Sequence, residues 1–401
     1  MTSPEPLLKR SEFVALTALL TSLVAMSIDS MLPALGAIGN DLGIAYANDT
    51  QLVISAMFFG LAIAQMIFGP LSDSLGRKLS IYIGLGLFLI GSLIAMSATT
   101  FAMLLGGRVL QGIGAAGPRI VSVASVRDLY KGSRMAQIMS LVMAVFIIVP
   151  TVAPAIGQGV LMVASWRAIF FVLLIQGVVA TIWLALRMPE TLVLSKRSKF
   201  SIGNIGHAVL ETIRSRVGFG YTIAAGLVSG AFLGYLSSAK QIFVDQYGVG
   251  RAFPLYFGSL ALTLGTAAIV NSRLVERLGM RRLCWWALVG MSCLSILFAG
   301  GLAFGSGNPP LVATMGYLLP LFFCVGILFG NFNSLALEPL GHIAGTASAV
   351  IGSVTTFIGL GFGVGIGRAL DQTVIPLVVG FGSLGMAALV VMWRVERRTF
   401  F

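Results

Sequence analysis

Three ionisable side chains lie inside long apolar runs of this sequence: Asp29, Arg108 and Arg119. If these runs cross a membrane, each charge is costly, because a charged group near the bilayer centre costs about 2.5–3.5 kcal/mol even on the gentler insertion scale. Desolvation favours a neutral carboxyl group, whereas a nearby guanidinium favours an ionised one. An aspartate between these two influences can load a proton in one state and release it in another.

The spacing of these residues limits what Asp29 can meet. We expect one helix to end near Ala34 and another to begin near Ala102. At 1.5 Å per residue, Asp29 and Arg108 then each lie about 8 or 9 Å from the outer end. The two side chains can therefore meet or compete. The alternative is that Asp29 is a permanently ionised partner of Arg108, since buried charges often simply pair.

The composition excludes a soluble protein. The chain has 401 residues, of which 57% are hydrophobic and 10% charged, whereas soluble domains carry about 25% charged residues. Windows of roughly 20 apolar residues are long enough to cross the hydrocarbon core. They begin near residues 13, 51, 79, 101, 135, 167, 218, 253, 283, 311, 346 and 374. Continuous apolar runs favour helices over a closed barrel, so we predict an all-α polytopic membrane protein with twelve transmembrane helices.

The first window has an alternative interpretation as a signal peptide. Lys9 and Arg10 precede it, and the small-residue stretch 25–27 resembles a cleavage site. The apolar run continues past this stretch to Pro33. We therefore expect a retained first helix.

Lys and Arg predict the orientation in the membrane. With the N-terminus inside, the exterior loops hold Arg167, Lys240, Arg251 and Arg368, and the interior loops hold most of the remaining cations. Cytoplasmic loops carry the excess of Lys and Arg, so we expect a bacterial inner-membrane protein with both termini cytoplasmic. The net charge of +12 then reflects topology, and nucleic-acid binding is excluded because no soluble domain carries a basic patch.

The longest internal polar stretch, 190–216, divides the chain into two sets of six helices. We predict an N-terminal bundle at 1–192, a cytoplasmic linker loop at 193–216 and a C-terminal bundle at 217–401. The segments 73–78 and 276–282 support this division, because in both an acid precedes Gly by three residues and a basic pair follows. Such an internal repeat is expected of a two-bundle secondary transporter.

The segment GPLSDSLGRK, residues 69–78, resembles the signature loop of the major facilitator superfamily between its second and third helices. The resemblance implies a conformational latch in which Asp73 faces a helix N-terminus of the opposite half and nearby arginines. A carboxylate at such a terminus contributes up to about 2 kcal/mol when partly buried. The alternative is that the cations only anchor the loop inside the cell. The residues that the resemblance assigns to the latch are Gly69, Asp73, Gly76, Arg77 and Lys78.

Further motifs narrow the resemblance. RVLQGIG at 108–114 is similar to a superfamily motif whose intramembrane arginine tunes proton transfer, and PTVAPAIG at 150–157 resembles the antiporter motif of exporters, with Pro150, Pro154 and Gly157. Gln158 departs from that motif, which usually has a second glycine. The stretches 166–170, 189–192 and 344–349 resemble the bicyclomycin-resistance and chloramphenicol-efflux (Bcr/CflA) branch of the drug:proton antiporters. The resemblance implies that Asp29 couples protons to export, with Arg108 beside it.

The substrate cavity is predicted from polar, aromatic and flexible residues in the predicted helices. Arg119 follows Arg108 by eleven residues, so both guanidiniums lie on one helical face about 16 Å apart. Arginine binds carboxylate or phosphate groups bidentately, which favours an anionic or zwitterionic substrate, unless Arg119 snorkels to the headgroups. Tyr235 has the alternative of an interfacial anchor. The predicted cavity residues are Ser22, Met26, Gln111, Arg119, Tyr235, Asn331 and Asn333.

Other classes of protein are less compatible with the sequence. The three cysteines and two histidines have no metal-ligand spacing, so we expect no metal and no cofactor. An enzyme is disfavoured because no catalytic constellation accompanies Asp29. A proton symporter importing an organic anion or nutrient shares the fold, and the antiporter motif argues against it. We expect a monomer whose partners are protons, the lipid bilayer and a small molecule.

Overall fold

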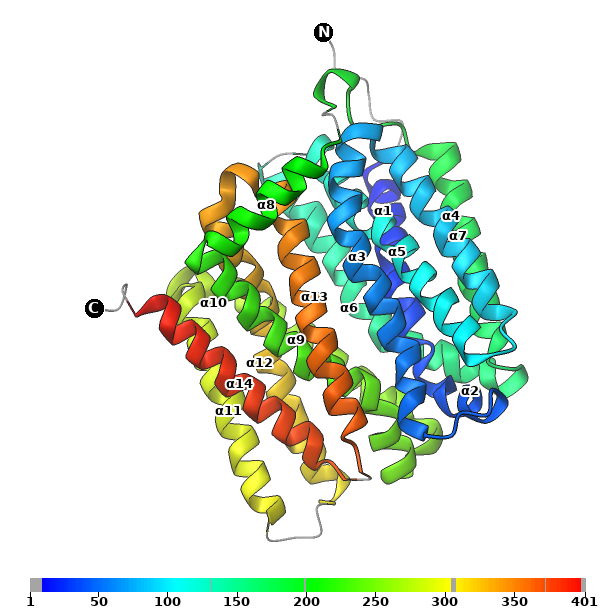
Figure 1. Ribbon diagram of the computed structural model, residues 1–401, viewed down its shortest axis with the longest axis vertical. Coiled ribbons are helices and arrows are strands. Elements are labelled where there is room, and N and C mark those ends of the chain that lie inside the picture. Colours follow the sequence, from blue (N-terminus) through cyan, green and yellow to red (C-terminus); the bar gives the residue numbers. More distant parts are fainter. Residues whose placement is uncertain (1–8, 131, 198–199, 304–307, 372, 398–401) are drawn as a thin grey trace. The chain divides into compact units, whose positions relative to one another are not determined.

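The computed structural model describes residues 9–130, 132–197, 200–303, 308–371 and 373–397. Within these ranges the secondary structure is helical throughout (Figure 1). The long helices of the first half are α1 Arg10–Asp29, α3 Leu52–Leu75, α4 Arg77–Met96, α5 Phe101–Leu129, α6 Gly132–Val163 and α7 Arg167–Arg187. Those of the second half are α9 Arg216–Lys240, α10 Phe253–Leu278, α11 Met280–Ala303, α12 Leu311–Leu337, α13 Ala344–Arg368 and α14 Ile375–Glu396.

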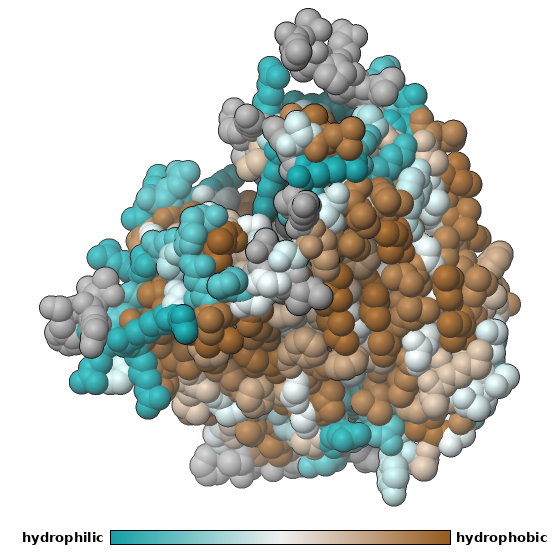
Figure 2. Space-filling model, turned by 45° about the horizontal axis from the view of Figure 1, so that its top comes forward, coloured by the Kyte–Doolittle hydropathy of each residue, from teal (hydrophilic) through white to brown (hydrophobic). Residues whose placement is uncertain are grey.

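These helices confirm the predicted polytopic fold. Ten stretches of the described residues are long and apolar enough to cross a membrane; one of them, Leu311–Arg368, contains both α12 and α13, and α6 contributes a shorter apolar stretch, Ile148–Val163. Figure 2 shows one face of the molecule covered largely by hydrophobic side chains. Large apolar residues such as Leu255, Leu297 and Val312 are exposed, as expected of surfaces that face lipid tails rather than water.

The chain forms two compact units. One contains the residues up to Ala34 together with Ala56–Ile202, and the other contains Leu35–Ser55 together with Gly203–Phe401. The short helix α2, Leu35–Asp41, therefore groups with the second unit. The predicted bundle boundaries stay a prediction.

The predicted linker loop is partly helical, which corrects the expectation of a loop. Helix α8 spans Ile202–Arg214, and α9 begins at Arg216. Leu210 and Ile213 are exposed on α8, whereas Ala208 and Thr212 are buried. The spacing of four between the buried residues shows that one face of this helix is covered and the other is exposed.

The first helix ends earlier than predicted. The α-helix stops at Asp29, and a separate 3-10 turn follows at Leu32–Ala34. Pro33 accounts for the break, because a proline ring clashes with the carbonyl group four residues before it, here that of Asp29. Asp29 is thus the last residue of a helix rather than a residue more than a turn inside one.

Close helix packing in each unit depends on glycine. In the first unit α4 packs against α5, where a Cβ atom on Gly91 would lie 2.4 Å from the Gln111 backbone nitrogen. In the second unit α9 packs against α13, where a Cβ atom on Gly226 would lie 2.7 Å from the Ile358 side chain. Small residues let membrane helices approach closely without a hydrophobic driving force. These contacts fix the helices that carry the polar residues described next.

Candidate functional site

Asp29 stands alone at the end of α1. The residue is buried, with 4% exposed, and no other described residue forms a hydrogen bond or ion pair with its carboxyl group. A negative charge at a helix C-terminus opposes the helix dipole. An ionised Asp29 is therefore doubly unfavourable in this place, and binding a proton removes the charge.

The helix break that follows Asp29 is stabilised by hydrogen bonds within α1 and by contact with α6. Ser30 donates from its hydroxyl group and its amide nitrogen to the Met26 carbonyl. Gly157 of α6 lies against the Ser30 carbonyl oxygen, where a Cβ atom would come within 2.0 Å. The antiporter motif thus contacts the residue next to the buried acid.

Arg108 is fully buried in α5 and forms a hydrogen bond with a side-chain amide. Its Nη1 atom donates to Gln111 Oε1, and Gln111 Nε2 donates to Ser92 Oγ of α4 at 2.8 Å. The guanidinium also lies 5.9 Å from the centre of the Phe170 ring of α7. No ion pair joins the described residues Asp29 and Arg108. The alternative of a permanent Asp29–Arg108 pair is therefore absent from this conformation. Gln111 is buried and bonded to Arg108, and its place in a substrate cavity stays a prediction.

The remaining predicted cavity residues of the first unit differ in burial. Ser22 is buried and accepts a hydrogen bond of 3.0 Å from Gln176 Nε2 of α7. Met26 and Arg119 are half-buried. Pro118, directly before Arg119, is buried against α4, where a Cβ atom on Gly84 would lie 2.6 Å from the proline ring. Sequence reasoning missed Gln176, the one polar residue within the apolar stretch 168–180 of α7.

The antiporter motif contributes mainly small, packed residues. Gly157 and Pro154 are buried and Pro150 is half-buried. Gln158, where the motif usually has a second glycine, is half-buried and lies beside the contact rather than in it. The departure at Gln158 therefore leaves the close approach of α6 to α1 intact.

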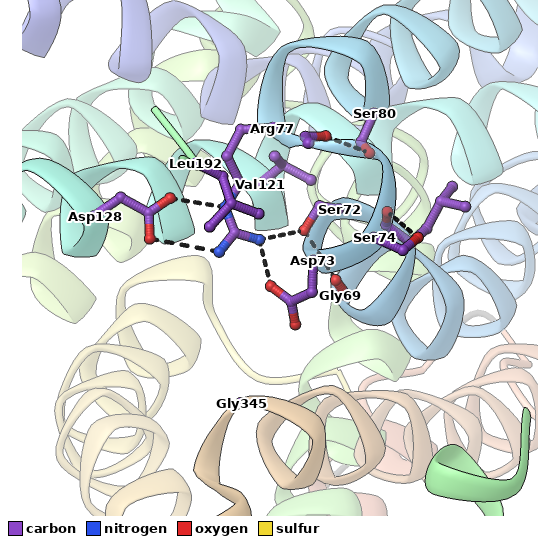
Figure 3. Close-up of polar contacts among 12 residues, drawn as sticks. Gly69, Ser72, Asp73, Ser74, Arg77, Ser80, Val121, Asp128, Leu192 and Gly345 are labelled. Carbon is purple, nitrogen blue, oxygen red and sulfur yellow. Dashed lines mark hydrogen bonds and ion pairs between the residues drawn. The ribbon is translucent and has the colours of Figure 1, made fainter. Parts of the chain in front are cut away.

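The predicted latch residues Asp73 and Arg77 are in direct contact, and Figure 3 shows the Arg77 guanidinium between Asp73 and Asp128. Arg77 is buried at the start of α4, and its guanidinium forms ion pairs with Asp73 of α3 and, at 2.8 Å, with Asp128 of α5. It also donates to Ser72 Oγ at 2.7 Å. An arginine with two carboxylates satisfies several of its five N–H donors at once, so it ties three helix ends of one unit together. The predicted contact of Asp73 with the other half stays a prediction.

Glu190 caps the N-terminus of α4 in the same network. Its carboxylate accepts from the backbone amides of Arg77, at 2.9 Å, and Lys78, at 3.2 Å. Gly76 makes room for it, with φ 101° and Glu190 Oε2 2.5 Å from where a Cβ atom would stand. Lys78 Nζ donates to the Ala185 carbonyl at 3.3 Å.

Asp128 and Glu190 were not predicted. Both lie at or just beyond the ends of long helices, in RDL at 127–129 and PETL at 189–192. An acid next to a helix end, in a chain with few acids, was the available signal. Gly69, the remaining residue of the predicted latch, accepts a hydrogen bond of 2.8 Å from Ser72 Oγ within α3.

The second unit repeats this arrangement. Gly279 has φ 78°, and Arg281, two residues later, pairs with Glu396 at 3.0 Å and Glu338 at 2.7 Å. Tyr221 donates to Glu396 Oε1 at 2.7 Å. The repeat seen in the two loops thus extends to the acids at the ends of helices far along the chain.

Of the predicted cavity residues in the second unit, two are buried and one is not. Tyr235 is 1% exposed, and its ring stacks on that of Phe257. It also makes an edge contact with Phe322, with 4.7 Å between the two ring centres. Tyr235 is therefore a packed interior residue rather than an exposed interfacial anchor. Asn331 forms a reciprocal amide pair with Asn271 of α10, at 2.7 and 3.2 Å. Asn333 is exposed on another face of α12.

No group of three or more His, Cys, Asp or Glu residues that could hold a metal ion occurs within the described ranges. The side chains of the site can instead bind and release protons, donate hydrogen bonds and pair with an anion.

The protein has long apolar helices that enclose a few buried polar groups, and its two halves repeat the same loop arrangement. These features are typical of one class of protein, the multi-pass membrane transporters. A match to the Major Facilitator Superfamily extends over residues 17–366, and the chain belongs to this family of small-molecule transporters, which are not enzymes.

The chain is similar to two relatives of known sequence and to one solved structure. It is 30% identical over 357 residues to YdgK of Bacillus subtilis (strain 168), called an uncharacterized MFS-type transporter, covering 88% of this chain and 87% of the relative. It is 26% identical over 385 residues to the bicyclomycin resistance protein homolog of Haemophilus influenzae, covering 92% of each. The crystal structure of the human organic anion transporter MFSD10 superposes with a TM-score of 0.71 at 16% identity, over 98% of this chain and 100% of that one. At that identity the likeness shows the fold alone, whereas the bicyclomycin-resistance relative agrees in name with the branch that the motifs resemble.

Proposed function

We propose that this protein exports small organic molecules from a bacterial cell in exchange for protons, by alternating access. The observation that carries the proposal is the solitary buried carboxyl group of Asp29 next to the antiporter motif. The drug-resistance name of a relative that matches along almost the whole chain supports export over import.

Asp29 is the proton carrier in this proposal. When the protein is open to the outside, the carboxyl group of Asp29 takes up a proton. The protonated, neutral form is compatible with a site that excludes water. When the other side opens, water stabilises the ionised form and the proton leaves to the cytoplasm. Arg108 supplies a fixed positive charge on α5, which lies against α1 and favours the ionised form when the two side chains approach.

In this proposal the Arg77 network holds Asp73 at the end of α3, and the predicted contact of Asp73 with a helix N-terminus of the other half sets the energy difference between the two states. Arg77 binds two acids, and Glu190 binds two backbone amides, all on the side where the Lys and Arg distribution predicts the cytoplasm. A carboxylate at a helix N-terminus contributes up to about 2 kcal/mol when it is partly buried. That is enough to bias a two-state equilibrium without locking it.

The finer properties follow from the same proposal. We assign the protein to the inner membrane with both termini cytoplasmic, because most Lys and Arg residues then lie inside. We assign it to function as a monomer, since each unit has its own packed helices. Its partners are the bilayer, protons and a small organic substrate.

Asp29→Asn tests the proposal. Inside-out vesicles energised by respiration should accumulate radiolabelled chloramphenicol or bicyclomycin, and an uncoupler should abolish the gradient. The Asn variant should fold, because removing a buried acid also removes its desolvation penalty, yet accumulate no substrate. Ser27→Ala, which changes a buried residue of α1 that bonds only to the Leu23 carbonyl, is the matched control and should retain accumulation. A pH-driven gradient built by the Asn variant would place the proton carrier elsewhere, and depletion of substrate from such vesicles would reveal an importer.

A further inference from the structure

Gly157 is the tightest point between α6 and the break in α1. A Cβ atom on Gly157 would lie 2.0 Å from the Ser30 carbonyl oxygen and 2.9 Å from the carbonyl carbon. Both atoms belong to the backbone, so no side chain can rotate away to make room. The α6 backbone therefore rests directly on the peptide unit that joins Ser30 to Met31, one residue beyond Asp29.

This contact meets α1 at its weakest place. Asp29 is the last residue of the α-helix, and Pro33 prevents the helix from continuing. Beyond the helix, Met31 N bonds to the Ile28 carbonyl and Ala34 N to the Met31 carbonyl, both in tight turns. A helix end held by a few turn bonds shifts more easily than a helix interior.

We propose that Gly157 is a positioning residue for Asp29: through the Ser30 peptide unit, movement of α6 moves the Asp29 carboxyl group between a dry and a wet setting. The inference rests on the proposed function, in which Asp29 carries the proton. It gives the antiporter motif a physical task, which is to transmit the conformational change of α6 to the proton site.

The described charged side chains on the helices next to Asp29 do not override this control by packing. The helices packed against α1 are α5, α6 and α7. No ion pair joins Asp29 to any of their described charged residues. Those residues are Arg108, Arg119, Arg127 and Asp128 on α5, Arg134 on α6, and Arg167 and Arg187 on α7. The setting of the carboxyl group is thus governed by packing and access to water rather than by an ionic partner.

The test compares two glycines of the same helix. Gly157→Ala forces α6 away from the Ser30 carbonyl, whereas Gly159→Ala adds a methyl group where no atom lies within 4 Å. Infrared spectra of the purified full-length protein in lipid, recorded over a range of pH, give the protonation midpoint of Asp29, identified by the carboxylic acid band that Asp29→Asn removes.

We expect Gly157→Ala to shift this midpoint by about one pH unit toward lower pH, because a looser break admits water and one unit is the usual spread among carboxyl groups in folded proteins. Gly159→Ala should leave the midpoint unchanged. If Gly157→Ala does not fold, Pro33→Ala displaces the break without adding atoms to α6, and the same shift is expected.

The outcomes separate this inference from the proposed function. An unchanged midpoint in Gly157→Ala, or in Pro33→Ala where the glycine variant does not fold, overturns the positioning role, and so does an equal shift in Gly159→Ala. The export proposal is then still tested separately, by substrate accumulation in the Asp29→Asn variant. Conversely, a shifted midpoint with proton-driven accumulation intact in Asp29→Asn supports the positioning of Asp29 while removing its role as carrier.

Discussion

At the scale of single residues, two arginines lie on the helix α5 of the first unit. Arg108 is fully buried and donates a hydrogen bond to the neutral side chain of Gln111. Arg119 is half-buried on the same helix, after the proline that packs on α4. When Asp29 is protonated, both arginines favour an anionic or zwitterionic group on the substrate.

Arg119 therefore gives a prediction about substrate charge. Arg119→Gln should weaken export of organic acids about tenfold or more, the effect of losing a charged hydrogen bond of about 1.5–3 kcal/mol, and should change export of neutral phenicols little. Arg119→Lys keeps the charge and should retain most of the export of acids. The measurement is competition by each substrate class against labelled uptake into inside-out vesicles. Equal, slight effects on both classes would show that Arg119 is a headgroup anchor.

At the scale of helices and loops, the two units use the same device with different packing. In each, a glycine with positive φ is followed by an arginine that binds acids at the ends of other helices. In the first unit the glycine also faces Glu190, whereas nothing lies within 4 Å of a Cβ atom on Gly279. Arg77 is also the more buried, its side chain 8% exposed against 38% for Arg281. The first-unit loop is therefore the more tightly built of the two.

The two loop glycines offer a matched pair of variants. Gly279→Ala should cost about 1–2 kcal/mol, the price of placing a side chain at positive φ. Gly76→Ala should cost this strain and, in addition, displace the Glu190 carboxylate from the α4 N-terminus, so its melting temperature should fall further. Thermal unfolding of both purified variants, followed by intrinsic tryptophan fluorescence, measures the difference. Equal losses would mean that Glu190 contributes nothing at this terminus.

At the scale of the whole molecule, the membrane determines both surface and topology. Apolar side chains face outward along the long helices, and most Lys and Arg residues lie in or next to the connections that the predicted topology places inside the cell. The linker helix α8, with its exposed Leu210 and Ile213, belongs to the same cytoplasmic side under this topology.

Labelling of single cysteines tests this topology. In a variant with Cys284, Cys293 and Cys324 replaced by serine, Tyr46→Cys should react with a membrane-impermeant thiol reagent in intact cells, and Leu194→Cys should react only after permeabilisation. Both native residues are well exposed, at 74% and 77%, so access of the reagent depends on the side of the membrane. The opposite pattern would reverse the orientation drawn from the Lys and Arg distribution.

The sequence by itself determined the fold class, the approximate places of the long helices and the family. These follow from local properties: an apolar run of sufficient length must form a helix in lipid, because its backbone groups have no water to bond with. The loop motifs likewise identified Arg77 and Gly76 from contiguous residues.

Only the tertiary structure decided which groups meet. Arg77 pairs with Asp128 across 51 residues and bonds through its amide to Glu190 across 113, and Asn331 pairs with Asn271 across 60. The structure also shows no ion pair between the described residues Asp29 and Arg108 and sets Gly157 against Ser30, two outcomes of helix packing that no local periodicity encodes. Helical repetition fixes the face on which a residue lies, but the approach and rotation of neighbouring helices select its partner, and those depend on side chains far away in the chain.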